Sequence, residues 1–99
     1  MSEHEEPEGF EGDLTVTAEG EQPRTAHAAL AARFAPLAGQ VVWSGRIAAD
    51  YPPRTVLVLS TPHGSARAEA TERDVWGNTR VVGLDRPPFP VALLDAAGS

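Results

Sequence analysis

The chain contains no cysteine and no lysine, and each absence removes whole classes of protein chemistry. Without cysteine there can be no disulfide, no thiolate nucleophile and no cysteine metal site. All eight basic residues are arginines, so Schiff-base, phosphate-loop and general-base lysines are excluded as well. Long apolar runs are also missing: none approaches the roughly 20 residues needed to cross a bilayer. The acidic N-terminus lacks the basic region of a signal peptide, so we expect a cytoplasmic protein with no membrane partner.

Acidic residues are concentrated at the N-terminal end. The first 21 residues contain eight acids and no arginine, whereas the rest contains six acids and eight arginines. The formal charge of −6 therefore belongs to the leading segment, and the remainder carries +2. We expect residues 1–8 to be a disordered acidic tail, with an interaction tail as the alternative. No dense cluster of arginines is present, which argues against nucleic acid as a partner.

The length and composition predict one small domain with a modest core. The chain has 99 residues, of which 41% are hydrophobic but only 6% aromatic. We place a single β-barrel-like domain at residues 9–93 and a frayed C-terminus at residues 94–99. Sixteen alanines and the use of arginine alone indicate a GC-rich coding sequence, as in actinobacteria. A small core contributes only a few kcal/mol beyond the entropy cost of folding, so dimerisation is a natural further source of stability.

Alternation of apolar and polar residues is the dominant pattern and predicts strands. In the run from Arg24 to Phe34, helix is the competing interpretation because alanine is the best helix former. Strand is favoured there, since a period of two puts every polar residue on one side. The predicted strands are Phe10–Ala18, Arg24–Phe34, Gln40–Ala49, Arg54–Ser60, Ser65–Thr71 and Asn78–Leu84.

Short connections with proline, glycine and aspartate separate these strands. Their spacing of roughly 10 to 15 residues leaves no room for a parallel crossover helix. We therefore predict an all-β fold of about six antiparallel strands in a meander that forms a small barrel or sandwich.

Arg46, which follows Gly45, is the strongest polar candidate for a binding site. An arginine on a strand, with a glycine beside it to allow close approach, can hold a carboxylate or enolate with two hydrogen bonds. The alternative, which we favour, is an ion pair with Asp50, Asp74 or Glu69 within the chain.

The other candidate binding residues have simpler, structural explanations. Trp43 and Trp76 are most simply core residues or plugs of the barrel ends, the alternative being an aromatic wall for a ligand. His63 lies on a predicted turn, where a histidine can act as acid or base but is usually just solvated. The histidines lack the close spacing of metal ligands, so we expect no metal site, and nothing points to a cofactor.

Several spaced motifs resemble those of a known family. They are a Phe-x-Pro turn and a glycine, a Trp-x-Gly-Arg strand, a Thr-Pro-x-Gly turn, a Trp-Gly pair and a Pro-Pro-Phe ending. In this chain they read Phe34, Pro36, Gly39, Trp43, Gly45, Arg46, Thr61, Pro62, Gly64, Trp76, Gly77, Pro87, Pro88 and Phe89. Residues from about 9 to 91 thus resemble the actinobacterial small-domain family "domain of unknown function 4873". The resemblance implies a domain found alone or fused C-terminally to flavin-containing monooxygenases, with no settled activity.

Departures from the family pattern fall beside the tryptophan strand. Val41, Val42 and Ser44 stand where the family tends to have tyrosine, histidine and an aromatic residue, and Ala38 replaces an acid. Arg33 replaces a histidine before the phenylalanine. These changes indicate a specialised member with a roomier surface or pocket. We accordingly expect a ligand-binding set of Arg46, Trp43, Arg33, Trp76 and His63.

A second apolar face accompanies the presumed core. The residues concerned are Ala29, Ala31, Val42, Ala48, Val56 and Val58. One small sheet has a single interior, so this face indicates burial against a partner, and an isologous homodimer is the preferred explanation.

Two functional interpretations follow. In the first, an alanine-lined interior leaves a pocket for a small apolar metabolite of specialised, natural-product metabolism, where the domain binds it or acts as a cofactor-free cyclase or isomerase. In the second, the domain is a non-catalytic module that dimerises or docks onto a flavoprotein such as a flavin monooxygenase. The first is narrowly favoured.

Overall fold

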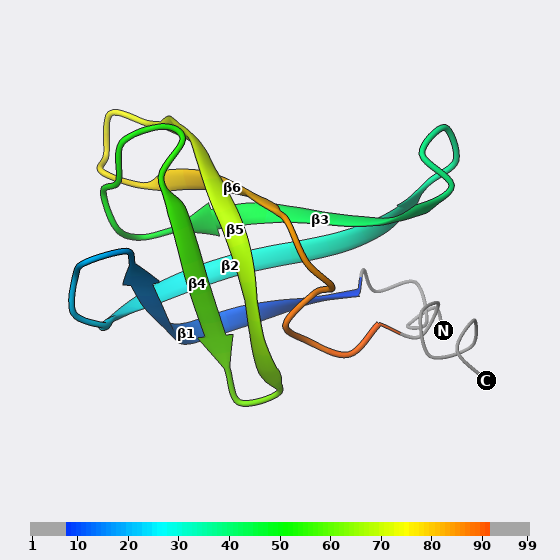
Figure 1. Ribbon diagram of the computed structural model, residues 1–99, viewed down its shortest axis with the longest axis horizontal. Coiled ribbons are helices and arrows are strands. Elements are labelled where there is room, and N and C mark those ends of the chain that lie inside the picture. The colour runs from blue at the N-terminus through cyan, green and yellow to red at the C-terminus, as the bar shows by residue number, and fades with distance from the viewer. Residues whose placement is uncertain (1–7, 92–99) are drawn as a thin grey trace.

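Six antiparallel strands close into a barrel in the computed structural model, which describes residues 8–91 and has no helix there (Figure 1). The strands are β1 (Glu8–Ala18), β2 (Arg24–Ala35), β3 (Gln40–Ile47), β4 (Val56–Thr61), β5 (Gly64–Arg73) and β6 (Thr79–Gly83). The predicted all-β class is confirmed, and each predicted strand end lies within two residues of the observed one. Glu8 begins β1, while the rest of the predicted acidic tail and the predicted frayed C-terminus lie outside the described residues.

The strand order around the barrel is β1-β2-β3-β6-β5-β4. It therefore contains two three-stranded meanders, which join where β3 pairs with β6 and β1 pairs with β4. A single meander would instead place β4 beside β3. This does not happen because residues 48–55 cross one end of the barrel before β4 begins. Within that crossing, Tyr51 is buried and its backbone N–H donates to Thr79 Oγ1 at 3.0 Å.

Alternating side chains of β2 and β5 supply most of the alanines of the core. In the strand order these two strands lie opposite each other, and Ala26, Ala28 and Ala32 therefore face Ala66, Ala68 and Ala70 across the interior. The larger buried side chains are Leu30 of β2 and, from the other strands, Leu14, Val16, Ile47, Leu57, Leu59 and Val81. A six-stranded barrel is too narrow for large residues from every wall, so alanine on two walls leaves space for large residues from the other four.

The second end of the barrel is covered by residues 84–91, which we call the strap. Pro88, Phe89 and Val91 of the strap are buried. Thr61 Oγ1 donates to the carbonyl oxygen of Pro88 at 2.5 Å, which ties the strap to the end of β4. Prolines stop regular structure here, as the sequence indicates, but the segment still completes the core.

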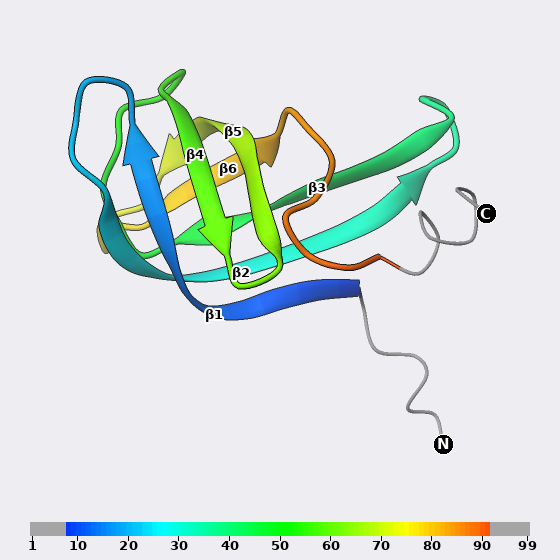
Figure 2. The same cartoon turned by 60° about the horizontal axis from the view of Figure 1, so that its bottom comes forward.

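The β2–β3 hairpin extends beyond the barrel as an arm, which comprises residues 33–42 (Figure 1). Pairing of β3 with β6 covers only Ser44–Ile47, so the first half of β3 lies outside the closed part of the sheet. Figure 2 shows β1 first running alongside β2 and then turning toward β4. Gly12, in the middle of β1, has a φ of 151°, a backbone conformation that favours glycine. Within residues 8–91, no helix of the length and apolarity of a membrane span occurs.

Candidate functional site

A surface groove with a volume of about 400 Å³ lies where the arm leaves the barrel. Its lining comes from β2, β3 and β6 and consists of Ala31, Ala32, Arg33, Val42, Trp43, Ser44, Arg80 and Val82. Most of these side chains point away from the core, so the groove opens on the outer face of the sheet. The expected pocket in the alanine-lined interior gains no support, because the buried alanines are packed against larger core residues.

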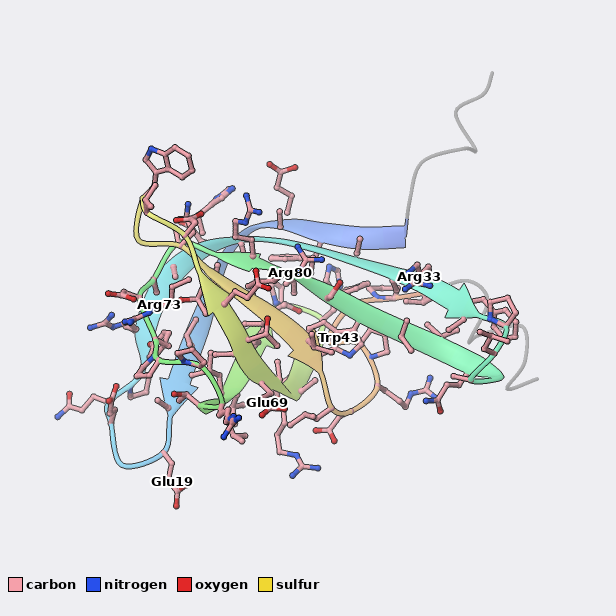
Figure 3. All side chains as sticks on the ribbon, turned by 90° about the horizontal axis from the view of Figure 1, so that it is seen from above. Glu19, Arg33, Trp43, Glu69, Arg73 and Arg80 are labelled. Carbon is pink, nitrogen blue, oxygen red and sulfur yellow. The ribbon has the colours of Figure 1, made fainter. Side chains whose placement is uncertain are left out.

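Strand register explains why these residues meet. Ala31 lies opposite Ser44, and Ser44 lies opposite Val82, so the three form one row across β2, β3 and β6. Arg33 lies opposite Val42 one step toward the tip of the arm. Arg80 is two residues from Val82 and therefore points to the same side. Figure 3 shows Arg33 toward the arm, Arg80 toward the barrel, and Trp43 between them.

The chemistry of the groove is that of an anion site with an apolar floor. Its lining contains the two guanidinium groups of Arg33 and Arg80 and the hydroxyl of Ser44, but no carboxylate. Ala31, Val42 and Val82 supply the apolar surface between the arginines. Arginine binds carboxylates through paired, charge-assisted hydrogen bonds. The groove therefore matches a small molecule with an acidic head and a hydrocarbon body.

Trp43 contributes to this groove from a fixed position. Its side chain is buried, with 2% of its surface exposed, and its indole Nε1–H donates to the carbonyl oxygen of Asp85 at 2.7 Å. The ring also meets Phe89 edge to face, with ring centroids 6.3 Å apart. The interpretation of Trp43 as a core residue or a plug of a barrel end is confirmed. The strap, which holds the indole, also supports the inner side of the groove.

Asp85 anchors the strap to β5. Arg67 Nη2 and Nε donate to the Asp85 carboxylate at 2.9 and 3.1 Å, and the Arg67 backbone N–H donates to it at 3.0 Å. These hydrogen bonds lower the pKa of Asp85 below its ordinary value, the side-chain bond having the larger effect.

Trp76 does not plug the barrel, and that interpretation is wrong. It lies in the β5–β6 turn with 81% of its surface exposed, beside Val75 at 88%. Asp74 shapes the turn, because its Oδ1 accepts the backbone N–H groups of Trp76 at 2.8 Å and Asn78 at 3.0 Å. Aspartate commonly stabilises turns by accepting hydrogen bonds from backbone N–H groups a few residues on. Trp76 is not part of the groove lining.

Arg46 lies in a separate small cleft that it shares with Glu72, Arg73, Asp74, Asn78 and Arg80. Among the acids considered as its partners, Asp50 pairs with Arg73 at 3.1 Å. Asp74 has a lowered pKa, caused first by the backbone N–H of Asn78 and with a smaller contribution from the charge of Arg46. Arg46 thus interacts electrostatically with the carboxylate that shapes the exposed turn.

The histidines lie elsewhere on the surface. His63 follows Pro62 in the β4–β5 turn, as predicted, and its ring meets the edge of Phe10 with centroids 6.4 Å apart. His27 lies on β2 between two acids of β1, with Nδ1 3.5 Å from Asp13 and Nε2 3.8 Å from Glu11. In the part of the chain that the structure describes, no three histidine, cysteine or acidic residues are arranged to hold a metal.

The structure therefore brings two of the five predicted binding residues together, Arg33 and Trp43, and separates Arg46, Trp76 and His63 from them. Arg80 and Val82 were not predicted as site residues. The sequence shows that they share one face of β6, but only the pairing of β6 with β3 places that face beside Arg33. Val42 and Ser44, identified as departures beside the tryptophan, do line the groove.

Comparison with known proteins gives one match. The model of the family described as "Domain of unknown function (DUF4873)" matches residues 7–91. No curated protein and no solved structure matches the chain.

Proposed function

Because the chain belongs to the DUF4873 family, whose description names no activity, we propose a function from the groove itself: the domain binds a small amphipathic carboxylate on the outer face of β2, β3 and β6. Arg33 and Arg80 hold the acid group, and the apolar floor holds the hydrocarbon body. The supporting observation is a lining that has two arginines and no carboxylate.

The volume of the groove agrees with such a ligand. Small-molecule sites commonly measure about 300 to 1,000 Å³ and combine an apolar lining with a few polar groups that fix orientation. The groove, at about 400 Å³, lies near the lower end of this range. Its opening to solvent favours a ligand of modest affinity whose head group remains partly hydrated.

Catalysis would depend on the arginines, because the groove lining contains no histidine, acid, cysteine or tyrosine. An arginine can stabilise the negative charge of an enolate that forms during a cyclisation or isomerisation. The proton would have to move within the substrate or to water. Binding is therefore the primary function that we propose, and turnover is an extension of it. A role in specialised, natural-product metabolism rests on the resemblance to actinobacterial domains.

The experiment is a comparison of octanoate with octanamide, monitored by the amide signals of isotope-labelled protein in NMR spectra. Octanoate should shift the signals of Ala31, Val42, Ser44 and Val82, and octanamide should bind several-fold more weakly. Each exposed arginine should contribute about 1 kcal/mol, so Arg33→Ala and Arg80→Ala should each weaken binding roughly fivefold.

Arg86→Ala is the matched control, because Arg86 is an exposed arginine of the strap that does not line the groove. It should leave octanoate binding unchanged. Signal shifts confined to the strap and the β4–β5 turn, or equal binding of acid and amide, would count against the proposal.

A second function, docking onto a flavin monooxygenase, is favoured by the β5–β6 turn. Val75 and Trp76 are highly exposed there, yet the backbone beneath them is held by Asp74. Exposed tryptophans on an ordered support are common centres of binding energy at protein interfaces. Of the residues that line the groove, Arg80 alone also lines the small cleft beside this turn.

The docking function is tested by mixing the protein with a purified flavin-containing monooxygenase from the same host. Binding should be lost in Trp76→Ala and kept in Leu37→Ala, which removes a different exposed apolar side chain. Binding that survives Trp76→Ala would exclude this turn as the docking element.

A further inference from the structure

The outer face of β1, β2 and β3 carries charges of opposite sign on either side of a strip of short side chains. One row across the sheet reads Glu11, Ala29 and Arg46, and all three residues are exposed. The next row reads Gly9, Ala31 and Ser44. Acidic side chains therefore border the strip on the β1 side, and a basic side chain borders it on the β3 side.

This arrangement is complementary to itself. Neighbouring strands lie about 4.8 Å apart, so Glu11 and Arg46 are each roughly one strand from Ala29. A two-fold axis that lies between the two facing sheets, parallel to β2 and directly over Ala29, exchanges the two borders. It places Glu11 of one copy over Arg46 of the other, and this pair occurs twice because the interface is isologous.

We propose that the outer face of β1, β2 and β3 is a homodimer interface centred on Ala29, in which Glu11 of each copy pairs with Arg46 of the other. The short side chains of Ala29, Ala31 and Gly9 let the two sheets approach closely. The longer glutamate and arginine side chains bridge the sheets at the borders, where partial exposure reduces their desolvation cost.

The same axis determines what faces the neighbouring rows. Asp13 lies two residues beyond Glu11 on β1 and next to His27 of β2. The two-fold carries His27 of one copy over His27 of the other, and in the row on the other side of Ala29 it carries Ala31 over Ala31 and Gly9 over Ser44. Ser44 and Ala31 line the groove. The dimer therefore covers the edge of the groove that these two residues line.

The proposal does not depend on a ligand in the groove, because it rests on the charges and register of an outer sheet face. The second copy is favoured over an unrelated partner, since one surface already supplies both complementary borders. The homodimer would also bury apolar outer residues of β2 and β3 that belong to the second apolar face predicted from the sequence.

Charge reversal at the two borders tests the pairing. The dissociation constant of the wild-type dimer is measured by sedimentation over a range of concentrations. Arg46→Glu and Glu11→Arg should each raise it roughly 100-fold, because every reversal turns two attractive pairs into repulsive ones. The double variant carrying both reversals should return to within about tenfold of wild type.

Two milder variants and two controls complete the design. Glu11→Gln and Arg46→Gln remove the attraction without adding repulsion, and each should weaken the dimer roughly tenfold. Glu19→Arg in the β1–β2 turn and Arg86→Glu in the strap make the same charge changes at exposed positions outside the face and should leave the dimer intact. Circular dichroism verifies that every variant is folded.

The outcomes separate clearly. Wild-type protein that remains monomeric at all concentrations overturns the proposal. A dimer that ignores Arg46→Glu, or that the double reversal does not restore, overturns the pairing across Ala29. Dissociation by each single reversal with recovery in the double variant supports it, whatever the result of the octanoate experiment.

Discussion

Gly83→Ala, which adds a single methyl group, should be one of the most destabilising small substitutions in this domain. Gly83 ends β6 directly beneath the indole of Trp43. A Cβ at this position would lie 2.6 Å from Trp43 Cδ1 and closer still to Cε2 and Nε1. Gly83 does not have a positive φ, so the expected effect is steric and does not arise from the backbone conformation of glycine.

The loss of stability has two sources, which are the overfilling of the packed core and the loss of the hydrogen bond that the indole donates. Overfilling a packed core costs about 1 to 3 kcal/mol. A displaced indole also loses its hydrogen bond to the carbonyl oxygen of Asp85, and a part-buried unpaired donor costs about 1 kcal/mol or more. We expect the free energy of unfolding to fall by about 2 to 4 kcal/mol. For a domain of this size, that lowers the melting temperature by roughly 10 to 25 °C.

Urea unfolding followed by tryptophan fluorescence measures this change. Trp76 is exposed and would add a second signal, so all variants carry Trp76→Phe and report Trp43 alone. Gly20→Ala is the control, because it has φ 79° and nothing within 4 Å of its Cβ position. It should show only the backbone cost of about 1 kcal/mol.

A double-mutant cycle identifies the contact partner. In a Trp43→Leu background the added methyl group has no indole to displace, and Gly83→Ala should then cost less than about 1 kcal/mol. These variants contain no tryptophan, so their urea unfolding is followed by circular dichroism, with the Trp43 variants measured in the same way for comparison. The reasoning is refuted if Gly83→Ala costs under about 0.5 kcal/mol in the Trp43 protein, or if the cost is the same in both backgrounds.

Two further predictions concern groups that hold the barrel ends. Arg67 lowers the pKa of Asp85 in the folded state, so the stability due to this pair is present above the unfolded pKa of about 3.9 and is lost as pH falls through the folded pKa. Asp85→Asn should therefore flatten the decline in urea midpoint between about pH 5 and pH 2, and an unchanged decline would contradict the linkage. Thr79→Val should lower the free energy of unfolding by about 2 to 3 kcal/mol, because the buried hydroxyl accepts from Tyr51 N–H and donates to Ala49 O at 2.6 Å. Thr79→Ser, which keeps both hydrogen bonds, should recover at least half of that loss in the same urea titration.

Strands and faces could be predicted because alternation depends only on neighbours in sequence. The period of two in β2 separated Ala28 and Leu30, which are buried, from His27 and Ala29, which are exposed. The strand order could not be obtained this way. It depends on residues 48–55 crossing the barrel end, and the interactions that fix this crossing join Tyr51 to Thr79, 28 residues apart.

The candidate site was only partly predictable for the same reason. Arg33 and Val42 could be identified from the chain, because they stand beside the tryptophan and belong to one hairpin. Arg80 enters the site through the pairing of β3 with β6, which is a long-range contact. The exposure of Trp76 was not predicted, because a large apolar side chain is usually buried. The turn that carries it is held by hydrogen bonds from backbone N–H groups to Asp74, which the pattern of apolar and polar residues does not reveal.

The filled barrel determines where function can lie. The small alanine side chains of two walls leave an interior that Ile47, Leu57 and Leu59 fill. The crossing segment and the strap cover the two ends of the barrel. A ligand or partner must therefore be recognised by outward-facing residues, which alternate along each strand with those of the core. Substitutions on the inner face should then change stability, whereas Arg80 on the groove and Arg46 on the proposed interface can be replaced with little effect on folding. The alternation that predicted the fold thus also separates the residues for tests of stability from those for tests of binding.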